Sequence, residues 1–278
     1  MNALTRPLTF SAVDGLGFAA AGGQRDAAQS LSRYVPNSLG PLLELLHFAA
    51  GGRLALPYGG SWMGRDGLAP MVAALQENRE HWVSAVDRRM GFIRAVRTGL
   101  DGDNWLTSFL MDAQRAARDV ACLPGTTPGQ LTAAMRELES NIHEHSDAAE
   151  TGLLAFWAAH EVFEFVAADR GIGILASLRR CSTYAAVSDH GRALESALTD
   201  GISRYGNDSR RGHGFRPIFL GLVDLSGSLR FRSGDHALLI DGTSPNLTNA
   251  QLAQKPPLDG FFASVRCEGV RAGSERRA

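Results

Sequence analysis

The early part of the chain, before Leu68, consists of short apolar runs separated by frequent glycines, a pattern that predicts few long helices. From Leu68 to Val96, apolar residues recur three, four or seven positions apart, which predicts one or two amphipathic helices. A further helix is predicted over Leu106–Val120, and it ends before the Pro124–Pro128 segment, whose prolines and glycine cannot continue it. We therefore place a domain boundary near this segment, with residues 1–122 as an α-rich N-terminal region of unknown fold.

After the boundary, the pattern predicts helices that alternate with antiparallel strand pairs. Thr127 and Pro128 open a helix, because a capping hydroxyl followed by proline suits the first helical turn. The apolar stripe of this helix consists of Leu131, Ala134, Leu138 and Ile142. Alternating β-branched and aromatic residues then predict a hairpin of two strands, over 151–158 and 161–169. The later predictions are helical material over 175–203, a loop over 206–214, a helix over 215–225, and strands over 228–233 and 236–240. This order predicts an α+β fold built as a two-layer sandwich.

The basic residues exclude several classes of nucleotide and cofactor enzyme. Of the 28 basic residues only Lys255 is a lysine, and it lies far from any glycine-rich turn. Walker A proteins, eukaryotic-type protein kinases and pyridoxal enzymes each require a lysine at their phosphates or cofactor, so none of them is expected. The formal net charge of -1 indicates no clustered basic surface, and we expect neither a nucleic-acid partner nor a membrane partner.

The cysteines and the apolar stretches indicate the compartment. Cys122, Cys181 and Cys267 are far apart and odd in number, which favours neither a disulfide framework nor a zinc site. The first seven residues lack the basic start and apolar run of a secretory signal. The longest apolar stretch, over 153–168, contains charged residues and is shorter than the roughly 20 residues that span a bilayer. We therefore expect a cytoplasmic protein.

Three short motifs that can carry chemistry follow one another along the second half. Glu137, Asn141 and His145 are four residues apart and therefore project from one helix face. Asp169-Arg170-Gly171-Ile172-Gly173 puts a carboxylate and two glycines at a strand end, where the backbone must turn sharply. Arg211-Gly212-His213-Gly214 opens a predicted helix, where free backbone N–H groups can receive phosphate. Each motif alone is also typical of a solvated helix face or a tight turn, but their order and placement together are more specific.

Together the motifs resemble the Bergerat-fold (GHKL, histidine kinase-like) ATP-binding superfamily, which includes gyrase, MutL, the heat-shock chaperone ATPases, sensor histidine kinases and anti-sigma-factor serine kinases. Residues 137–145 look like the N-box of the anti-sigma type, and the two glycine motifs look like the G1 and G2 boxes. The resemblance covers about residues 125–242, and the roughly 35 residues between the two glycine motifs would form the mobile ATP lid. It implies helices on a mixed β-sheet, with an ATP-binding domain over 123–245. The remaining residues, 246–278, are then expected to be a solvated, arginine-rich tail.

The resemblance also implies a role for each motif residue. Asn141 would ligate Mg²⁺ through its amide oxygen, and Asp169 would accept a hydrogen bond from the adenine amino group of ATP. Glu137 would orient or deprotonate the attacking hydroxyl or water. His145 would either contact a phosphate or be an ordinary surface histidine. The other implied cofactor-binding residues are Gly171 and Gly173, which let the backbone approach the nucleotide, and Arg211, Gly212, His213 and Gly214 at the phosphates.

The sequence departs from the superfamily's pattern at two places, and each departure argues against some of its functions. Upstream of the N-box, His47 precedes Phe48 and His81 precedes Trp82, so no histidine has the acidic neighbour of a phosphoacceptor. The short stretch after residue 242 offers no second catalytic domain, so we expect neither a DNA-strand-passing machine nor a chaperone. The main hypothesis is a cytoplasmic bacterial regulatory protein that uses Mg-ATP to phosphorylate a serine or threonine of a partner, which by analogy is a STAS-like antagonist or a sigma factor.

Two alternatives stay open. The chain can be a nucleotide-gated binding switch without phosphotransfer, or an α+β domain in which the motif matches are accidental. In the first two hypotheses the N-terminal region, residues 1–122, is a partner-binding, sensory or dimerisation region.

Overall fold

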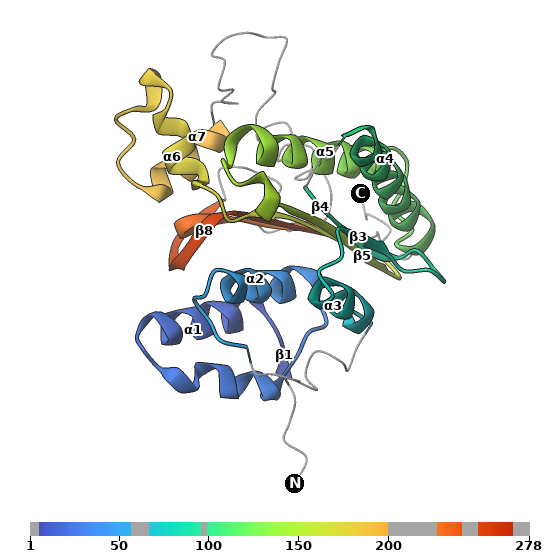
Figure 1. Cartoon of the computed structure of the whole chain (residues 1–278), viewed down its shortest axis with the longest axis horizontal. Coiled ribbons are helices and arrows are strands. Elements are labelled where there is room, and N and C mark those ends of the chain that lie inside the picture. The colour runs from blue at the N-terminus through green and yellow to red at the C-terminus, as the bar shows by residue number, and fades with distance from the viewer. Residues whose placement is uncertain (1–5, 57–66, 96–98, 200–226, 241–249, 269–278) are drawn as a thin grey trace, which may run out of the picture.

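A computed structural model of the chain places a β-sheet between two layers of helices (Figure 1). The residues that it describes are 6–56, 67–95, 99–199, 227–240 and 250–268. The described chain is therefore α+β, as predicted. The predicted helix over 215–225 and the loop over 206–214 lie outside the described residues.

Within the described chain, six strands form the central sheet. In spatial order they are β3 (His81–Val83), β4 (Met90–Arg94), β5 (Leu153–Ala159), β6 (Val162–Asp169), β8 (Gln251–Glu268) and β7 (Gly227–Ile240). Every neighbouring pair in this sheet is antiparallel, so the predicted mixed sheet is wrong. The predicted hairpin over 151–169 is confirmed as β5 and β6, and its turn contains Glu161 at a positive φ of 61°.

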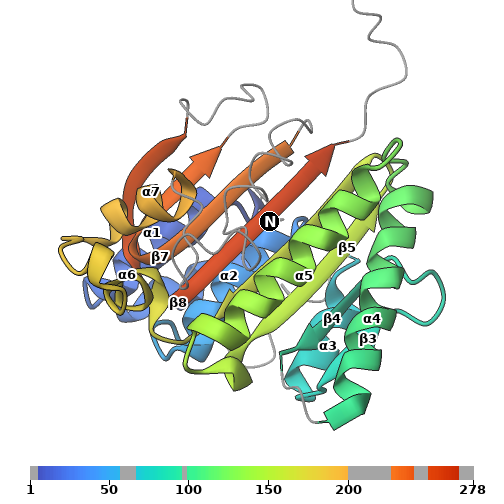
Figure 2. The same ribbon diagram turned by 90° about the horizontal axis from the view of Figure 1, so that it is seen from above.

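One layer of helices covers one face of the sheet (Figure 1). Its elements are α4 (Gly99–Arg115) with a π-helical end (Ala116–Val120), α5 (Thr127–His145), α6 (Gly173–Arg179), α7 (His190–Thr199) and two short 3-10 turns (Ala149–Thr151 and Ser182–Tyr184). Figure 2 shows α5 lying along the sheet beside α4. The helices predicted from Leu106 and from Thr127 are confirmed. The described part of the helical stretch predicted over 175–203 divides into α6 and α7, and its last four residues lie outside the described residues.

The other layer consists of described residues between 6 and 76 and lies against the opposite face of the sheet (Figure 1). It contains α1 (Phe10–Ala21), a 3-10 helix η1 (Arg25–Arg33), α2 (Leu39–Ala50), α3 (Ala69–Gln76), and a two-residue parallel pair of β1 (Arg6–Pro7) with β2 (Tyr34–Val35). The sheet thus has helices on both faces. The predicted two-layer sandwich corresponds to the sheet and the layer that contains α5, and the N-terminal helices add a third layer.

Strand alternation assigns side chains to these two faces, because successive residues of a strand point to opposite sides. In β6, Phe163, Phe165 and Ala167 belong to the core under α5, while Val166 and Ala168 belong to the core under α1 to α3. Because both faces are covered, β6 reads as an almost continuous apolar run.

The helix predictions for the N-terminal half are only partly right. The region before Leu68 forms two 12-residue helices, α1 and α2, where few long helices were expected. Their glycines are needed for close packing, since a Cβ on Gly17 would lie 2.7 Å from Pro256 and one on Gly40 would lie 2.3 Å from Ser264. Within Leu68–Val96, only α3 is helical.

The remainder of Leu68–Val96 forms the hairpin of β3 and β4. Asn78 (φ 56°) and Arg88 (φ 48°) turn the chain where the spacing pattern would continue a helix. Trp82 pairs with Phe92 across the hairpin, and Met90 and Ile93 lie on the same strand as Phe92, so part of the spacing that resembled a helix face falls on strand residues. Because β4 pairs with β5, one sheet crosses the boundary placed at residue 122.

The structure contradicts the predicted solvated tail after residue 245. Residues 251–268 form β8, which lies between β6 and β7 in the sheet. Arg266, which we expected in a solvated tail, pairs with the buried carboxylate of Glu164. The strands predicted over 228–233 and 236–240 form one strand, β7, whose register shifts around Gly234.

A buried cluster of charges joins α1 and α2 to the strands β7 and β8. Arg230 donates to Glu44 through Nε (2.7 Å) and Nη2 (2.8 Å), and its Nη2 also reaches Asp14. Arg232 donates to Glu44 and to the carbonyl oxygen of Pro256, and the Nζ atom of Lys255 lies 2.9 Å from Asp14. The single lysine of the chain therefore contributes one ion pair between β8 and α1.

Candidate functional site

The candidate site begins with the exposed edge of α5. Its apolar stripe, which includes Leu131, Leu138 and Ile142, is buried against the sheet as predicted. Glu137, Asn141 and His145 are each partly buried, so they are not a fully solvated face. Glu137 and His145 both make further interactions within the structure.

Asn141 carries an unsatisfied polar group. Its Nδ2 atom is buried and has no hydrogen-bond partner among the described residues. A buried donor without a partner costs about 1 to 3 kcal/mol, and an acceptor such as a phosphate oxygen or a water would remove that cost. The amide oxygen on the same carbon is the kind of hard ligand that Mg²⁺ prefers.

Asp169 is the second unusual group, and it terminates β6. The residue is only 3% exposed, and its Oδ1 atom accepts a hydrogen bond from the backbone N–H of Gly171 at 2.7 Å. Burial raises the pKa of Asp169 to about 7, although hydrogen bonds from the backbone of Gly171 and Phe261 oppose the shift. In the described part of the chain no cationic side chain pairs with this carboxylate, so its charge is unusually costly.

Asp169 and α5 lie on the same side of the sheet. Asp169 continues the series Phe163, Phe165 and Ala167, whose side chains pack under α5. The turn that follows Asp169 reaches the end of α5, where the backbone N–H of Ile172 donates to the carbonyl oxygen of Ser146 at 2.9 Å. Asn141 lies five residues before Ser146, which is about 7.5 Å along a helix at 1.5 Å per residue.

The two glycines of the turn allow a close approach of three backbone segments. A Cβ on Gly171 would lie 2.0 Å from the carbonyl oxygen of Ser146. Gly173 has a φ of 73°, and a Cβ there would lie 2.8 Å from the Oγ atom of Ser233. That hydroxyl accepts the N–H of Ile174 at 3.0 Å and donates to the carbonyl oxygen of Gly260 at 2.8 Å. The turn is therefore held by α5, β7 and β8 together.

Replacement of Gly171 tests this packing. We expect Gly171→Ala to lower the free energy of unfolding by about 1 to 3 kcal/mol, because an overpacked backbone must shift. Urea denaturation followed by circular dichroism measures the change.

The matched control is Gly129→Ala in α5, where the nearest atom to a new Cβ is 3.7 Å away in a side chain. Helix propensity predicts that this variant is as stable as the wild type or slightly more stable, since alanine favours a helix over glycine by about 1 kcal/mol. Equal effects of the two substitutions would contradict the packing described at Gly171.

The third motif lies outside the described residues, which do not include Arg211, Gly212, His213 or Gly214. The described part of the candidate site therefore consists of the residues of α5 and of the turn after β6.

Sequence reasoning missed the residues that support the turn. Ser146, Ser233 and Gly260 come from three distant segments, and only the fold brings them to Gly171 and Gly173. Gly260 has a φ of 70°, and a Cβ there would lie 2.0 Å from the carbonyl oxygen of Asp169. The sequence contains one sign of this contact, because Gly260 follows Asp259 within an apolar stretch. We predicted that stretch to be a solvated tail and therefore did not assign Gly260 a role.

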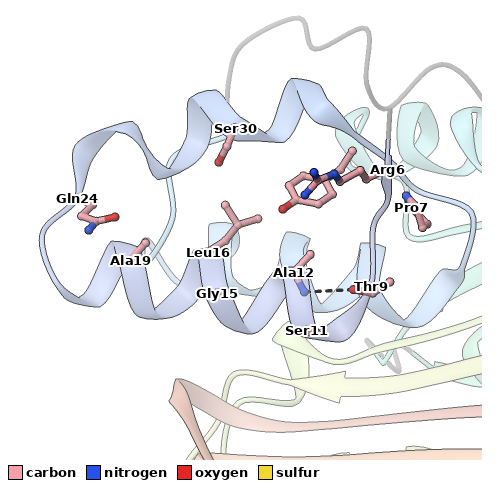
Figure 3. Close-up of a pocket in the computed structure, with 11 residues that line it drawn as sticks. Arg6, Pro7, Thr9, Ser11, Ala12, Gly15, Leu16, Ala19, Gln24 and Ser30 are labelled. Atoms are coloured by element: carbon pink, nitrogen blue, oxygen red, sulfur yellow. Dashed lines mark hydrogen bonds between the residues drawn. The ribbon is translucent and has the colours of Figure 1, made fainter. Parts of the chain in front are cut away.

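Two cavities lined by described residues lie away from these motifs. One, of about 660 Å³, is a groove between α1 and η1, where Gly15, Ala12 and Ala19 lie opposite Ser30 with Arg6 at one end (Figure 3). The other, of about 200 Å³, lies between α2, α3 and the sheet. The first contains no residue of the three motifs, and the second contains only Arg170 of the turn after β6.

Comparisons of the chain with protein-family models, curated proteins and solved structures find no match. None of the helices in the described part of the chain has the length and apolar character required to span a bilayer.

Proposed function

We propose that the chain binds Mg-ATP on the α5 side of the sheet and transfers phosphate to a serine or threonine of a partner protein. The observation that carries the proposal is that two buried polar groups lie on one side of the sheet. The Nδ2 atom of Asn141 has no hydrogen-bond partner among the described residues, and the carboxylate of Asp169 accepts backbone N–H groups but pairs with no cation there. Each group lacks a partner that a magnesium nucleotide would supply.

The chemistry of the two groups fits the parts of such a nucleotide. Asp169 can accept a hydrogen bond from the exocyclic amine of adenine, which guanine does not present at that position. In the described chain no group of three or more His, Cys, Asp or Glu residues could hold a metal ion. Magnesium would therefore be held by Asn141 and by the phosphates, which suits an ion that keeps several waters.

Under this proposal the neighbouring residues position the reaction. Glu137 lies one turn before Asn141 on the same face of α5 and would orient or deprotonate the acceptor hydroxyl. By resemblance, the partner would be a STAS-like antagonist or a sigma factor, and the protein would act in the cytoplasm.

Calorimetric titration with ATP, in the presence and absence of magnesium, tests the proposal. We expect wild type to bind Mg-ATP with micromolar affinity, about -8 kcal/mol, and to prefer ATP to GTP. Asp169→Asn should weaken binding at least about tenfold, which is about 1.4 kcal/mol, and Asn141→Ala should remove the dependence on magnesium.

The control is Asp147→Asn, because Asp147 is exposed and pairs with Arg180 close to the same turn. This variant should bind Mg-ATP as wild type does. Absence of binding by wild type, or equal binding by the Asp169 and Asp147 variants, would refute the proposal. Phosphate transfer is followed with ATP labelled at its terminal phosphate. If wild type and Glu137→Ala both bind Mg-ATP but neither transfers the label to a protein, the chain is a nucleotide-gated switch.

A further inference from the structure

The cavity of about 200 Å³ lies on the side of the sheet opposite to α5. It is enclosed by α2, α3 and the strand ends where β4 stops, β5 begins and β6 leads into the Asp169 turn. No motif identified in the sequence belongs to it except Arg170, whose role in the glycine-rich turn was unassigned.

The wall of this cavity is apolar. The side chains that form it include Leu46, Val72, Leu75, Leu153, Val166 and Phe262. Val166 and Phe262 are fully buried, so the floor is the sheet itself. Such a surface favours the apolar part of a ligand, because burying it removes apolar area from water.

One end of the cavity is positive. Arg94 and Arg170 both line it, and neither forms an ion pair with a carboxylate of the described residues. The Nε atom of Arg94 donates to the carbonyl oxygen of Arg79 at 3.1 Å, which leaves its terminal nitrogens for another acceptor.

The third polar group at this end is His47. Its Nε2 atom lies 2.9 Å from the carbonyl oxygen of Asp259. Burial lowers the pKa of Arg94 and of His47, and the charge of Arg170 lowers both further. Arg94 and Arg170 therefore create a positive potential at this end of the cavity, whereas at His47 the charges of Glu44 and Asp259 oppose it.

We propose that this cavity binds a small monocarboxylate with a compact apolar body. The paired guanidinium groups match a carboxylate, which arginine recognises through two parallel hydrogen bonds. The apolar wall matches the remainder of the molecule. The volume corresponds to about seven waters at about 30 Å³ each, which limits the ligand to a small molecule.

The site is separate from the proposed nucleotide site. Asp169 and Arg170 are adjacent in sequence, but Asp169 lies on the α5 side of the sheet and Arg170 lines the opposite cavity. Carboxylate binding can therefore be measured without nucleotide, and its outcome is independent of whether the chain binds ATP.

The experiment titrates the full chain with benzoate, with its neutral analogue benzamide and with inorganic phosphate, followed by calorimetry and by the shift in melting temperature. Benzoate should bind in a saturable manner and raise the melting temperature. Benzamide lacks the charge and phosphate lacks the apolar body, so each should bind at least about tenfold more weakly.

Three variants and a control locate the ligand. Arg94→Gln and Arg170→Gln should each weaken benzoate binding about tenfold or more, by removing a charged donor pair. Ala50→Leu, at an exposed residue of the lining, should block the cavity while both arginines remain. Arg192→Gln, at an exposed arginine of α7, should have no effect.

Circular dichroism and the melting temperature of each variant establish that it is folded before binding is compared. Benzamide or phosphate binding as tightly as benzoate would overturn the proposal. Unchanged benzoate binding in the Arg94 and Arg170 variants, or in Ala50→Leu, would overturn it as well, as would the absence of saturable binding by wild type.

Discussion

Glu44→Ala is expected to lower the free energy of unfolding by about 3 to 5 kcal/mol, which is the usual cost of removing one partner from a buried ion pair. Glu44 is 0% exposed and accepts hydrogen bonds from both Arg230 and Arg232. Without it, two guanidinium groups remain buried with Asp14 as the nearest carboxylate. Chemical denaturation monitored by circular dichroism measures the loss.

The charges of this cluster explain the size of the effect. In the described chain it holds three cations, Arg230, Arg232 and Lys255, against the carboxylates of Asp14 and Glu44. Burial opposes ionisation of Asp14, but the Arg230 charge and its hydrogen bond hold the pKa of Asp14 below its usual value. Burial lowers the pKa of Arg232, even with Glu44 in contact. Removal of Glu44 leaves three cations facing one carboxylate.

An exposed pair provides the control. Glu195 lies 3.0 Å from Arg192 on α7, and both side chains are open to solvent. Glu195→Ala should cost no more than about 1 kcal/mol, because surface ion pairs are screened by water. Glu44→Gln separates charge from shape: it should be destabilising as well, since the amide keeps the volume but not the charge. If the Glu44 and Glu195 variants were equally stable, the cluster would not stabilise the contact between the layers.

The parts of the fold that the sequence predicted have one property in common. Their helical or alternating period is local, as in α5 and in the hairpin of β5 and β6. The motif residues Asn141 and Asp169 fall on those elements, so their placement on one side of the sheet follows from local rules together with the alternation of β6.

The N-terminal layer could not be predicted because its glycines act through contacts with distant segments. Gly17 and Gly40 look like helix-breaking residues in sequence, yet they lie inside α1 and α2 where Pro256 and Ser264 pack against them. Glycine in a helix costs about 1 kcal/mol relative to alanine, a cost that close packing against the sheet offsets. That information resides in β8, more than 200 residues away along the chain.

The central position of β8 was missed for a related reason. Its first half contains Lys255, Pro256 and Pro257, which indicate a loop or an edge strand. In the structure the carbonyl oxygen of Pro256 accepts a hydrogen bond from buried Arg232, and Lys255 pairs with Asp14. These polar residues belong to the buried cluster, which no local pattern predicts.

The stability of wild type is expected to fall between about pH 4 and pH 7 because of Asp169. The pKa of this group is raised to about 7 in the folded state, mainly by burial, from an ordinary value of 3.8. A raised folded-state pKa stabilises the fold below the unfolded pKa, and that contribution is lost as the pH rises through the folded value. A difference of about 3 pKa units corresponds to about 4 kcal/mol at most.

Asp169→Asn removes this titration, since its amide stays neutral. The difference in free energy of unfolding between the variant and wild type should therefore increase in favour of the variant from pH 4 to pH 7 and stay constant above pH 8. Thermal and urea denaturation at several pH values measure it, with Asp147→Asn as an exposed control whose difference should vary little. A flat difference for Asp169→Asn would show that the carboxylate is ionised at low cost. It would also remove one argument for the nucleotide site, namely that the buried carboxylate of Asp169 is stabilised by a hydrogen-bond donor of a ligand. If the difference increases with pH as expected, Asp169→Asn has two opposed effects. It makes the chain without nucleotide more stable at pH 8, and it weakens the nucleotide complex. Such opposition is typical of a residue retained for binding at the expense of stability.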